Sequence, residues 1–154
     1  MNFLFISSEF PSGPGGIGNH AFNLARCINK YHSIDVLAIS DYVGLSESNE
    51  FDSMQQFFIK RFKRFKPSAT SYLIRIIELL IRMKKNNYTH CLLSGRFPLW
   101  MTLIIRYILL NNRIRLIAIL HGSELRPKSK LFKFLLSKSL NKVDLIISVS
   151  RFTE

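Results

Sequence analysis

The sequence has few of the residues on which several classes of small protein depend. Its 154 residues include two cysteines, Cys27 and Cys91, too few for a disulfide scaffold or a zinc ribbon. Both lie in apolar stretches and are expected to be buried free thiols. No second histidine or cysteine stands at metal-ligand spacing, and neither a G-x-S-x-G nucleophile elbow nor a cysteine–histidine pair is recognisable. We therefore expect no metal site and no covalent serine or cysteine hydrolysis.

Long hydrophobic runs are also missing. The N-terminal MNFLFIS has no basic region, and its apolar run is too short for a signal peptide. The best candidate span, residues 97–110, is shorter than the about 20 residues that a spanning helix needs, and it contains Arg106. The sequence therefore predicts a cytoplasmic protein that can touch the inner face of a membrane without crossing it.

Acidic residues are scarce and unevenly placed. The chain has 22 Lys and Arg against 10 Asp and Glu, a formal net charge of +12. Residues 1–56 carry two basic and six acidic side chains, whereas residues 57–154 carry twenty basic and four acidic ones. A basic region of this size attracts phosphate-rich partners: nucleic acid, an anionic bilayer or a phosphorylated small molecule.

Apolar residues, at 47% of the chain, are sufficient for one domain with a real core. Short apolar strands alternate with amphipathic helices. The expected strands are 2–7, 34–40, 57–65, 91–94, 115–120 and 144–149, and the expected helices are 17–31, 68–85, 98–110 and 128–140, with 41–56 as an exposed connection. The apolar stripe of the helix at 68–85 consists of Ile74, Ile77, Leu80 and Ile81. This alternation predicts an α/β fold: a Rossmann-like, doubly wound, mostly parallel sheet of about six strands with helices on both faces.

A glycine-rich loop follows the first strand. Gly13, Gly15 and Gly18 satisfy the pattern G-x-G-x-x-G, and Gly16 is a fourth glycine within it. Glycines let backbone amides approach a phosphate, and the next helix adds its positive N-terminal end. Asp41, at the end of the second strand, would suit the ribose of a dinucleotide. Residues 8–12 separate the glycines from their strand, however, and this longer loop also fits a flexible lid over a ligand or a permissive strand–helix turn.

A histidine follows the fifth strand. His121 comes directly after 115–120, and in such sheets ligands bind at the carboxyl ends of strands. An imidazole there can hydrogen-bond a hydroxyl or stabilise developing charge. Gly122 implies close backbone approach, and Glu124 is near enough to share the ligand or orient the loop. His20, near the start of the first helix, can face the same cleft.

Basic and aromatic residues alternate in residues 60–66, and lysines accompany apolar residues in the helix at 128–140. This combination suits an anionic membrane surface, near which each basic residue contributes about 1 kcal/mol. A solvated charged face is the alternative, and no nucleic-acid-binding motif accompanies the charge. The expected membrane-docking residues are Lys60, Arg61, Lys63 and Arg64.

Taken in order, these motifs resemble the N-terminal domain of GT-B glycosyltransferases of family 4. The resemblance rests on SEFPSGPGGIGNHAFNLARCI after a first strand, a strand ending in HGSEL, and the closing DLIISVSRFTE, and it covers essentially the whole chain. It implies two Rossmann-like domains across a cleft, the first receiving an acceptor and the second holding a nucleotide sugar. The implied reaction transfers a sugar to a hydroxyl, commonly with retention, without a bound metal ion, and with the nucleotide sugar as co-substrate rather than a cofactor.

The resemblance also implies roles for individual residues. His121 would be the catalytic residue, bonding the donor sugar and the reacting region. The glycines of the loop would approach the donor diphosphate or the sugar from across the cleft. The implied substrate-binding residues are Gly15, Gly16, Gly18, His20, Gly122, Glu124 and Arg151.

The family pattern continues past Glu154 into a donor-binding half. We therefore expect residues 1–154 to be a single N-terminal domain, inactive alone, that acts in the synthesis of cell-surface polysaccharide or glycolipid. Its expected partners are a nucleotide sugar, a glycan or lipid-linked acceptor, the donor-binding half and an anionic membrane surface, with no nucleic acid. The alternative is a stand-alone Rossmann-like module that binds a nucleotide, a phosphorylated ligand or an anionic membrane without catalysis.

Overall fold

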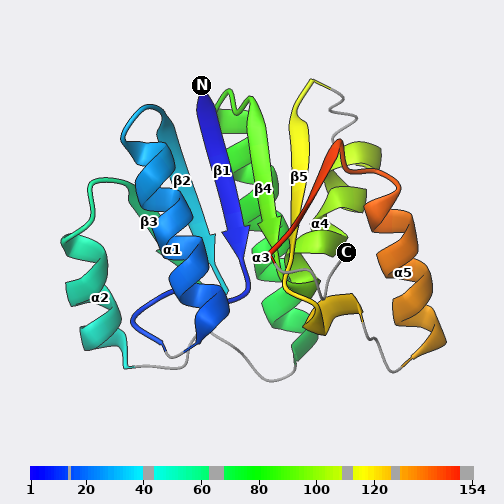
Figure 1. The fold of residues 1–154 in the computed structure, drawn as a ribbon, viewed down its shortest axis with the longest axis horizontal. Helices are drawn as coiled ribbons and strands as arrows, with labels where there is room; N and C mark the ends of the chain where they lie inside the picture. Colours follow the sequence, from blue (N-terminus) through cyan, green and yellow to red (C-terminus); the bar gives the residue numbers. More distant parts are fainter. Residues whose placement is uncertain (14, 40–43, 63–67, 109–112, 126–128, 150–154) are drawn as a thin grey trace.

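A computed structural model shows one six-stranded sheet with helices on both faces (Figure 1). It describes residues 1–13, 15–39, 44–62, 68–108, 113–125 and 129–149. The strands are β1 (Asn2–Ser7), β2 (Ser33–Ala38), β3 (Phe58–Arg61), β4 (His90–Ser94), β5 (Arg115–Leu120) and β6 (Leu145–Ser148). The helices are α1 (Gly16–Asn29), α2 (Leu45–Ser53), α3 (Ser68–Lys85), α4 (Arg96–Tyr107) and α5 (Lys130–Leu140), and Ser123–Leu125 forms a 3₁₀ turn, η1.

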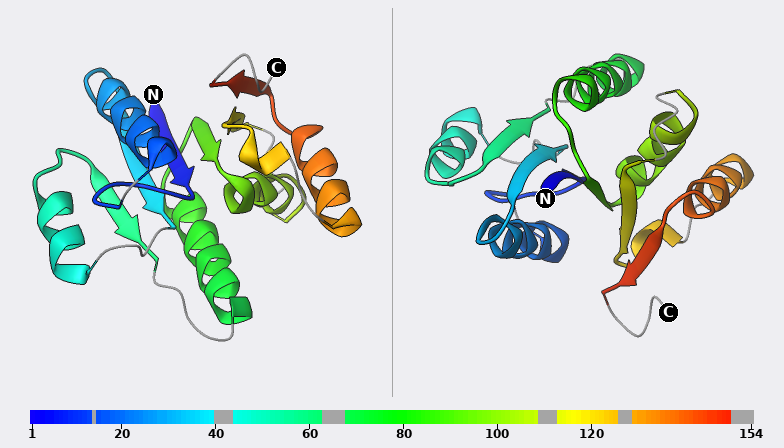
Figure 2. Two further views of the ribbon diagram at one scale, coloured as in Figure 1. Left: turned by 60° about the horizontal axis from the view of Figure 1, so that its bottom comes forward. Right: turned by 90° about the horizontal axis from the view of Figure 1, so that it is seen from above.

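The sheet has the order β3-β2-β1-β4-β5-β6, and every neighbouring pair is parallel. The chain moves outward from β1 to β3, returns to the centre at β4, and moves outward the other way. Right-handed crossovers then place α1 on one face and α3, α4 and α5 on the other, as Figure 2 shows. The predicted Rossmann-like α/β fold is confirmed.

Each face of the sheet has its own core. The cluster under α3, α4 and α5 includes Leu79, Ile105 and Leu136, and the cluster under α1 includes Ala21 and Ala25. The central strands are therefore covered on both sides, which explains why they read as continuous apolar runs rather than as alternating ones. Burying one large apolar side chain, such as that of Leu79 or Ile105, stabilises the fold by roughly 1.5–3 kcal/mol.

Two parts of the predicted layout were wrong. Residues 41–56 were expected to be an exposed connection, but Leu45–Ser53 forms α2. This polar helix has little apolar periodicity, and it is held by tertiary contact, since Phe51 packs edge-on against Phe22 of α1 at 5.1 Å. Cys27 is exposed on α1 instead of buried, whereas Cys91 is buried as expected, and burial raises the pKa of its thiol well above the usual range.

The apolar stripe predicted for α3 faces outward. The buried residues of this helix recur every fourth position, at Ser71, Arg75, Leu79 and Met83. Ile74, Ile77 and Ile81 of the predicted stripe are exposed, and Leu80 is half-buried. Arg75 can occupy the inner face because its guanidinium lies over the ring of Phe97 on α4, at 5.3 Å.

Candidate active site

The candidate site lies where β1, β4 and β5 end, at the lower edge of the sheet in Figure 1. This is also where the strand order reverses, between β1 and β4, and open α/β sheets bind ligands at such points. Three loops start from this edge: residues 8–15 before α1, Gly95 before α4, and residues 121–122 before η1.

His121 is the centre of this edge. Its Nε2 lies 3.0 Å from Oγ of Ser94, the last residue of the neighbouring strand β4. The ring of His20, from α1, meets the ring of His121 edge-on with centroids 5.3 Å apart. Because His20 lies one turn after Gly16, the glycine loop and His121 share one rim of the sheet, as the sequence predicted.

The loop after His121 is built by its own short-range contacts. The backbone N–H of His121 donates to Oε1 of Glu124 at 3.2 Å, and Glu124 is only 2% exposed. The N–H of Leu125 donates to the carbonyl of Gly122 at 3.2 Å, closing η1. Gly122 has φ +97°, a conformation that glycine adopts without strain. Glu124 therefore orients the loop from inside the protein.

The electrostatics of the site favour a neutral imidazole. Burial lowers the pKa of His121 from its ordinary value of 6.5, while Glu124 raises it and His20 lowers it further. Near pH 7 the ring therefore offers one donor and one acceptor nitrogen. Nδ1 of His20 is also buried, and it has no hydrogen-bond partner within the described part of the chain.

The glycines of the loop differ in whether the structure requires glycine at their positions. Gly15 has φ +138°, and a Cβ there would lie 2.6 Å from Oε2 of Glu9. Gly18 is buried, and a Cβ there would lie 3.3 Å from the backbone nitrogen of Phe10. A Cβ at Gly16 would meet nothing within 4 Å. The positive φ and the Glu9 side chain thus account for Gly15, and close backbone packing accounts for Gly18, whereas Gly16 has open space at the N-terminus of α1.

Ser94 and Gly95 were missed as site residues by the sequence analysis. The backbone N–H of Ser8 donates to the carbonyl of Ser94 at 2.9 Å, so the ends of β1 and β4 are joined where the order of the sheet reverses. Gly95 has φ +98°, and a Cβ there would lie 1.8 Å from Oγ of Ser8. The signal for Gly95 was its place directly after a strand, where the sequence already predicted ligand binding, whereas Ser94, which ends the strand, carried none.

Several expected residues cannot serve, or cannot be placed. Arg61 was expected on a membrane-docking surface, but its side chain is only 12% exposed, with Nε 2.8 Å from Oδ2 of Asp52. Its guanidinium also donates to the carbonyl of Pro11, so β3 and α2 both hold the loop before α1. Lys60 is exposed. Asp41, Lys63, Arg64 and Arg151 lie outside the described residues.

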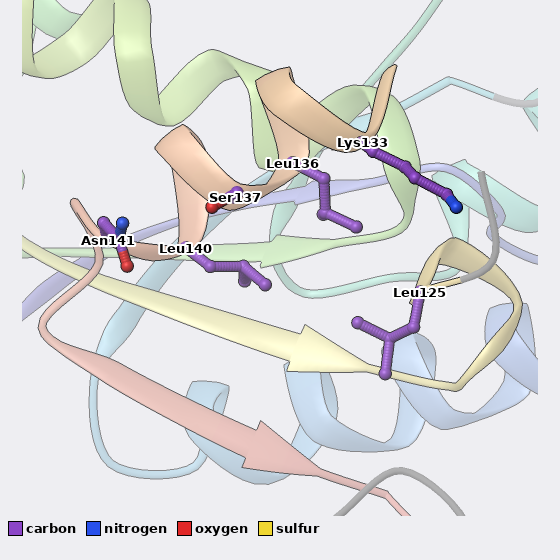
Figure 3. Close-up of a pocket in the computed structure, with 6 residues that line it drawn as sticks. All are labelled: Leu125, Lys133, Leu136, Ser137, Leu140 and Asn141. Atoms are coloured by element: carbon purple, nitrogen blue, oxygen red, sulfur yellow. The ribbon is translucent and has the colours of Figure 1, made fainter. Parts of the chain in front are cut away.

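A hollow of about 360 Å³ adjoins the His121 loop, between η1 and α5 (Figure 3). Leu125, Leu136 and Leu140 form its apolar lining, and Lys133 and Asn141 add polar groups. Within the described ranges, no group of three or more His, Cys, Asp or Glu could hold a metal ion. No described helix has the length and hydropathy needed to cross a membrane.

Fold and site define a Rossmann-like α/β domain whose chemistry gathers at the carboxyl edge of its sheet. The chain matches the model of Glycosyltransferase Family 4 over residues 14–154 and belongs to that family. Its fold is similar to that of MurG from Acinetobacter baumannii, with a TM-score of 0.65 and 14% sequence identity. The match covers 99% of this chain but 42% of MurG, so the chain spans less than half of that structure. No significant match was found among curated proteins.

Proposed function

We propose that this chain is the acceptor-side half of a GT-B glycosyltransferase. It receives an acceptor hydroxyl, to which a sugar is moved from a nucleotide-sugar donor, and it works opposite a donor-binding half. Membership of Glycosyltransferase Family 4 and the 42% coverage of MurG support this division of labour. Retention at the sugar carbon, independence of a metal ion, inactivity of the chain alone and a role in surface polysaccharide or glycolipid synthesis extend the proposal by the family resemblance.

The observation that carries the proposal is the contact of His121 with Ser94 and His20. A neutral imidazole at this position can hydrogen-bond a sugar or acceptor hydroxyl, and Ser94 fixes the orientation of its ring. The bond between the sugar carbon and the diphosphate breaks while a bond to the acceptor oxygen forms, and the proton of the acceptor hydroxyl passes to the departing diphosphate oxygen. Negative charge then grows on the departing diphosphate, and the N-terminus of α1 at Gly16 is suited to stabilise it.

The test compares two preparations across a panel of nucleotide sugars. The chain alone and the chain combined with a donor-binding half are assayed for release of nucleoside diphosphate in the presence of acceptor hydroxyls. Acceptor-dependent release by the combination, and none by the chain alone, is the expected result. Saturable nucleotide binding by the chain alone, without turnover in the combination, would instead support a stand-alone binding module.

A further inference from the structure

The outer side of α3 exposes a row of large apolar side chains. Leu73, Ile74, Ile77 and Ile81 have between 39% and 57% of their surface exposed. Their spacing places them together, opposite the face that carries Leu79 into the core. A single exposed apolar side chain on a surface needs no explanation, but a continuous row along a helix indicates a binding surface.

The outer side of α5 repeats this arrangement. Leu131 is 62% exposed and Phe134 is 58% exposed. Figure 2 shows α5 and α3 on the same face of the sheet, with α4 between them. Both helices begin at the carboxyl edge of the sheet, because each follows a loop that leaves this edge. Leu131 and Phe134 therefore lie toward the end of the molecule that holds the candidate site, whereas the apolar row on α3 runs from that end away from it.

The same face is basic. Glu78 is the one acidic residue in the sequences of α3, α4 and α5, and its Oε1 pairs with Nε of Arg82 at 2.7 Å. The exposed lysines of the two outer helices are Lys84, Lys85, Lys130, Lys133 and Lys138. By contrast, α2 beside the opposite face exposes Glu47 and Glu50. An anionic surface is therefore attracted more strongly to the face of α3, α4 and α5 than to α2.

We propose that the outer face of α3 and α5 docks on an anionic lipid bilayer. This docking face consists of Leu73, Ile74, Ile77, Ile81, Leu131 and Phe134 with the lysines of the two helices. Lysine is depleted from the cores of protein–protein interfaces, whereas at a membrane its long stem lies along the apolar region and its ammonium reaches the headgroups. The mixture of isoleucine, leucine and phenylalanine with lysine thus fits a bilayer better than a protein partner.

The docking face differs from the segment that the sequence pointed to, of which Arg61 is committed to Asp52 and Pro11, while Lys63 and Arg64 lie outside the described residues. Docking would hold the site edge close to the headgroups. If the proposed function holds, the acceptor is then an amphiphile whose sugar-bearing or hydroxyl end stands at the membrane surface. Membrane binding itself does not depend on turnover.

The experiment measures sedimentation of the full chain with phosphatidylcholine vesicles, with and without about 30% phosphatidylglycerol. We expect binding to the anionic vesicles, and release at high salt. Ile77→Ser/Ile81→Ser should lower the partition coefficient about tenfold or more. The matched control, Tyr31→Ser/Met54→Ser, changes two exposed apolar residues off the docking face and should change it less than about twofold.

A second double variant, at two lysines, tests the contribution of charge to vesicle binding. Lys130→Glu/Lys133→Glu leaves the apolar residues in place and should weaken binding to the anionic vesicles as high salt does. Circular dichroism and thermal unfolding establish that each variant is folded. Equal binding by wild type and Ile77→Ser/Ile81→Ser would overturn the proposal. The proposal would also be overturned if the wild type self-associated without binding vesicles and Ile77→Ser/Ile81→Ser abolished that self-association. Neither result bears on glycosyl transfer, which is assayed separately by nucleoside diphosphate release.

Discussion

The helices α1 and α3 cover opposite faces of one sheet and present opposite outer surfaces. Toward the sheet, α1 buries Gly18, Ala21 and Ala25, and its outer side exposes polar residues such as Asn19 and Asn23. In α3 the buried side includes an arginine and the outer side is rich in isoleucine. A helix that meets only core and water needs one apolar stripe, so the second stripe of α3 indicates another apolar surface.

The two helices also differ in how they serve the site. Small residues let α1 pack closely on the sheet, and this brings the ring of His20 against His121. Among the described side chains of α3, none is seen to contact His20 or His121. Under the two proposals, α1 therefore contributes to the candidate site, while α3 offers a surface for docking.

The largest expected effect is a difference in stability between substitutions on the two sides of α3. Leu79→Ala removes a side chain that is 1% exposed and should lower the free energy of unfolding by about 2–5 kcal/mol. Ile77→Ala, on the docking face, should change it by less than about 0.5 kcal/mol. Denaturant unfolding of the chain measures both. A comparable loss for Ile77→Ala would show that the outer stripe is packed in solution and that the contrast with α1 is mistaken.

The next effect concerns the site side of the comparison. His121→Ala in the enzyme formed with the donor-binding half should lower kcat about a hundredfold or more, with little loss of stability. His90→Ala is the control, because His90 begins β4 at the opposite edge of the sheet and stacks on Phe3. Steady-state kinetics should show near-normal turnover for His90→Ala. Unchanged turnover in His121→Ala would remove this residue from the mechanism.

A smaller effect compares two glycines at the site edge. Gly95→Ala places a Cβ against Ser8 at positive φ and should destabilise the fold by about 1–3 kcal/mol. Gly16→Ala has open space and ordinary backbone angles, so it should be neutral or stabilise by up to about 1 kcal/mol. Thermal unfolding distinguishes the two. If Gly16→Ala keeps its stability but loses turnover, ligand approach at this glycine is supported.

The smallest effect is a dependence of stability on pH. Because the folded state lowers the pKa of His121 below 6.5, the unfolded chain takes up the proton more readily in acid. The free energy of unfolding should therefore fall as the pH drops below about 6.5. Burial also lowers the pKa of His90, so His121→Gln and His90→Gln are compared with wild type. If the unfolding free energy of His121→Gln changed with pH as steeply as that of the wild type, His121 would not be the source of the pH dependence.

The sequence predicted the fold well because parallel strands buried on both faces are continuous apolar runs that periodicity detects. It missed α2, whose short polar segment carries no such period and depends on the contact of Phe51 with Phe22. For α3 the sequence offered apolar residues on two sides, and only the neighbouring Phe97 and the sheet decide which side is buried.

Within the site, the histidines were predictable from their places after a strand and at a helix start. Ser94 was not, because a serine that ends a strand looks like any other until a neighbouring strand places His121 beside it. The involvement of Arg61 with Pro11 was hidden for the same reason, since the two residues are far apart in the sequence.

The contact with Ser94 engages Nε2 of His121, so under the proposed function Nδ1 is the nitrogen that would meet a substrate. A serine hydroxyl can rotate to give or to receive a hydrogen bond, so the ring can exist in either tautomer while remaining uncharged. Nδ1 can thus present a lone pair to one hydroxyl or a proton to another. The same imidazole can in this way adapt to reactant and product without any change in its net charge.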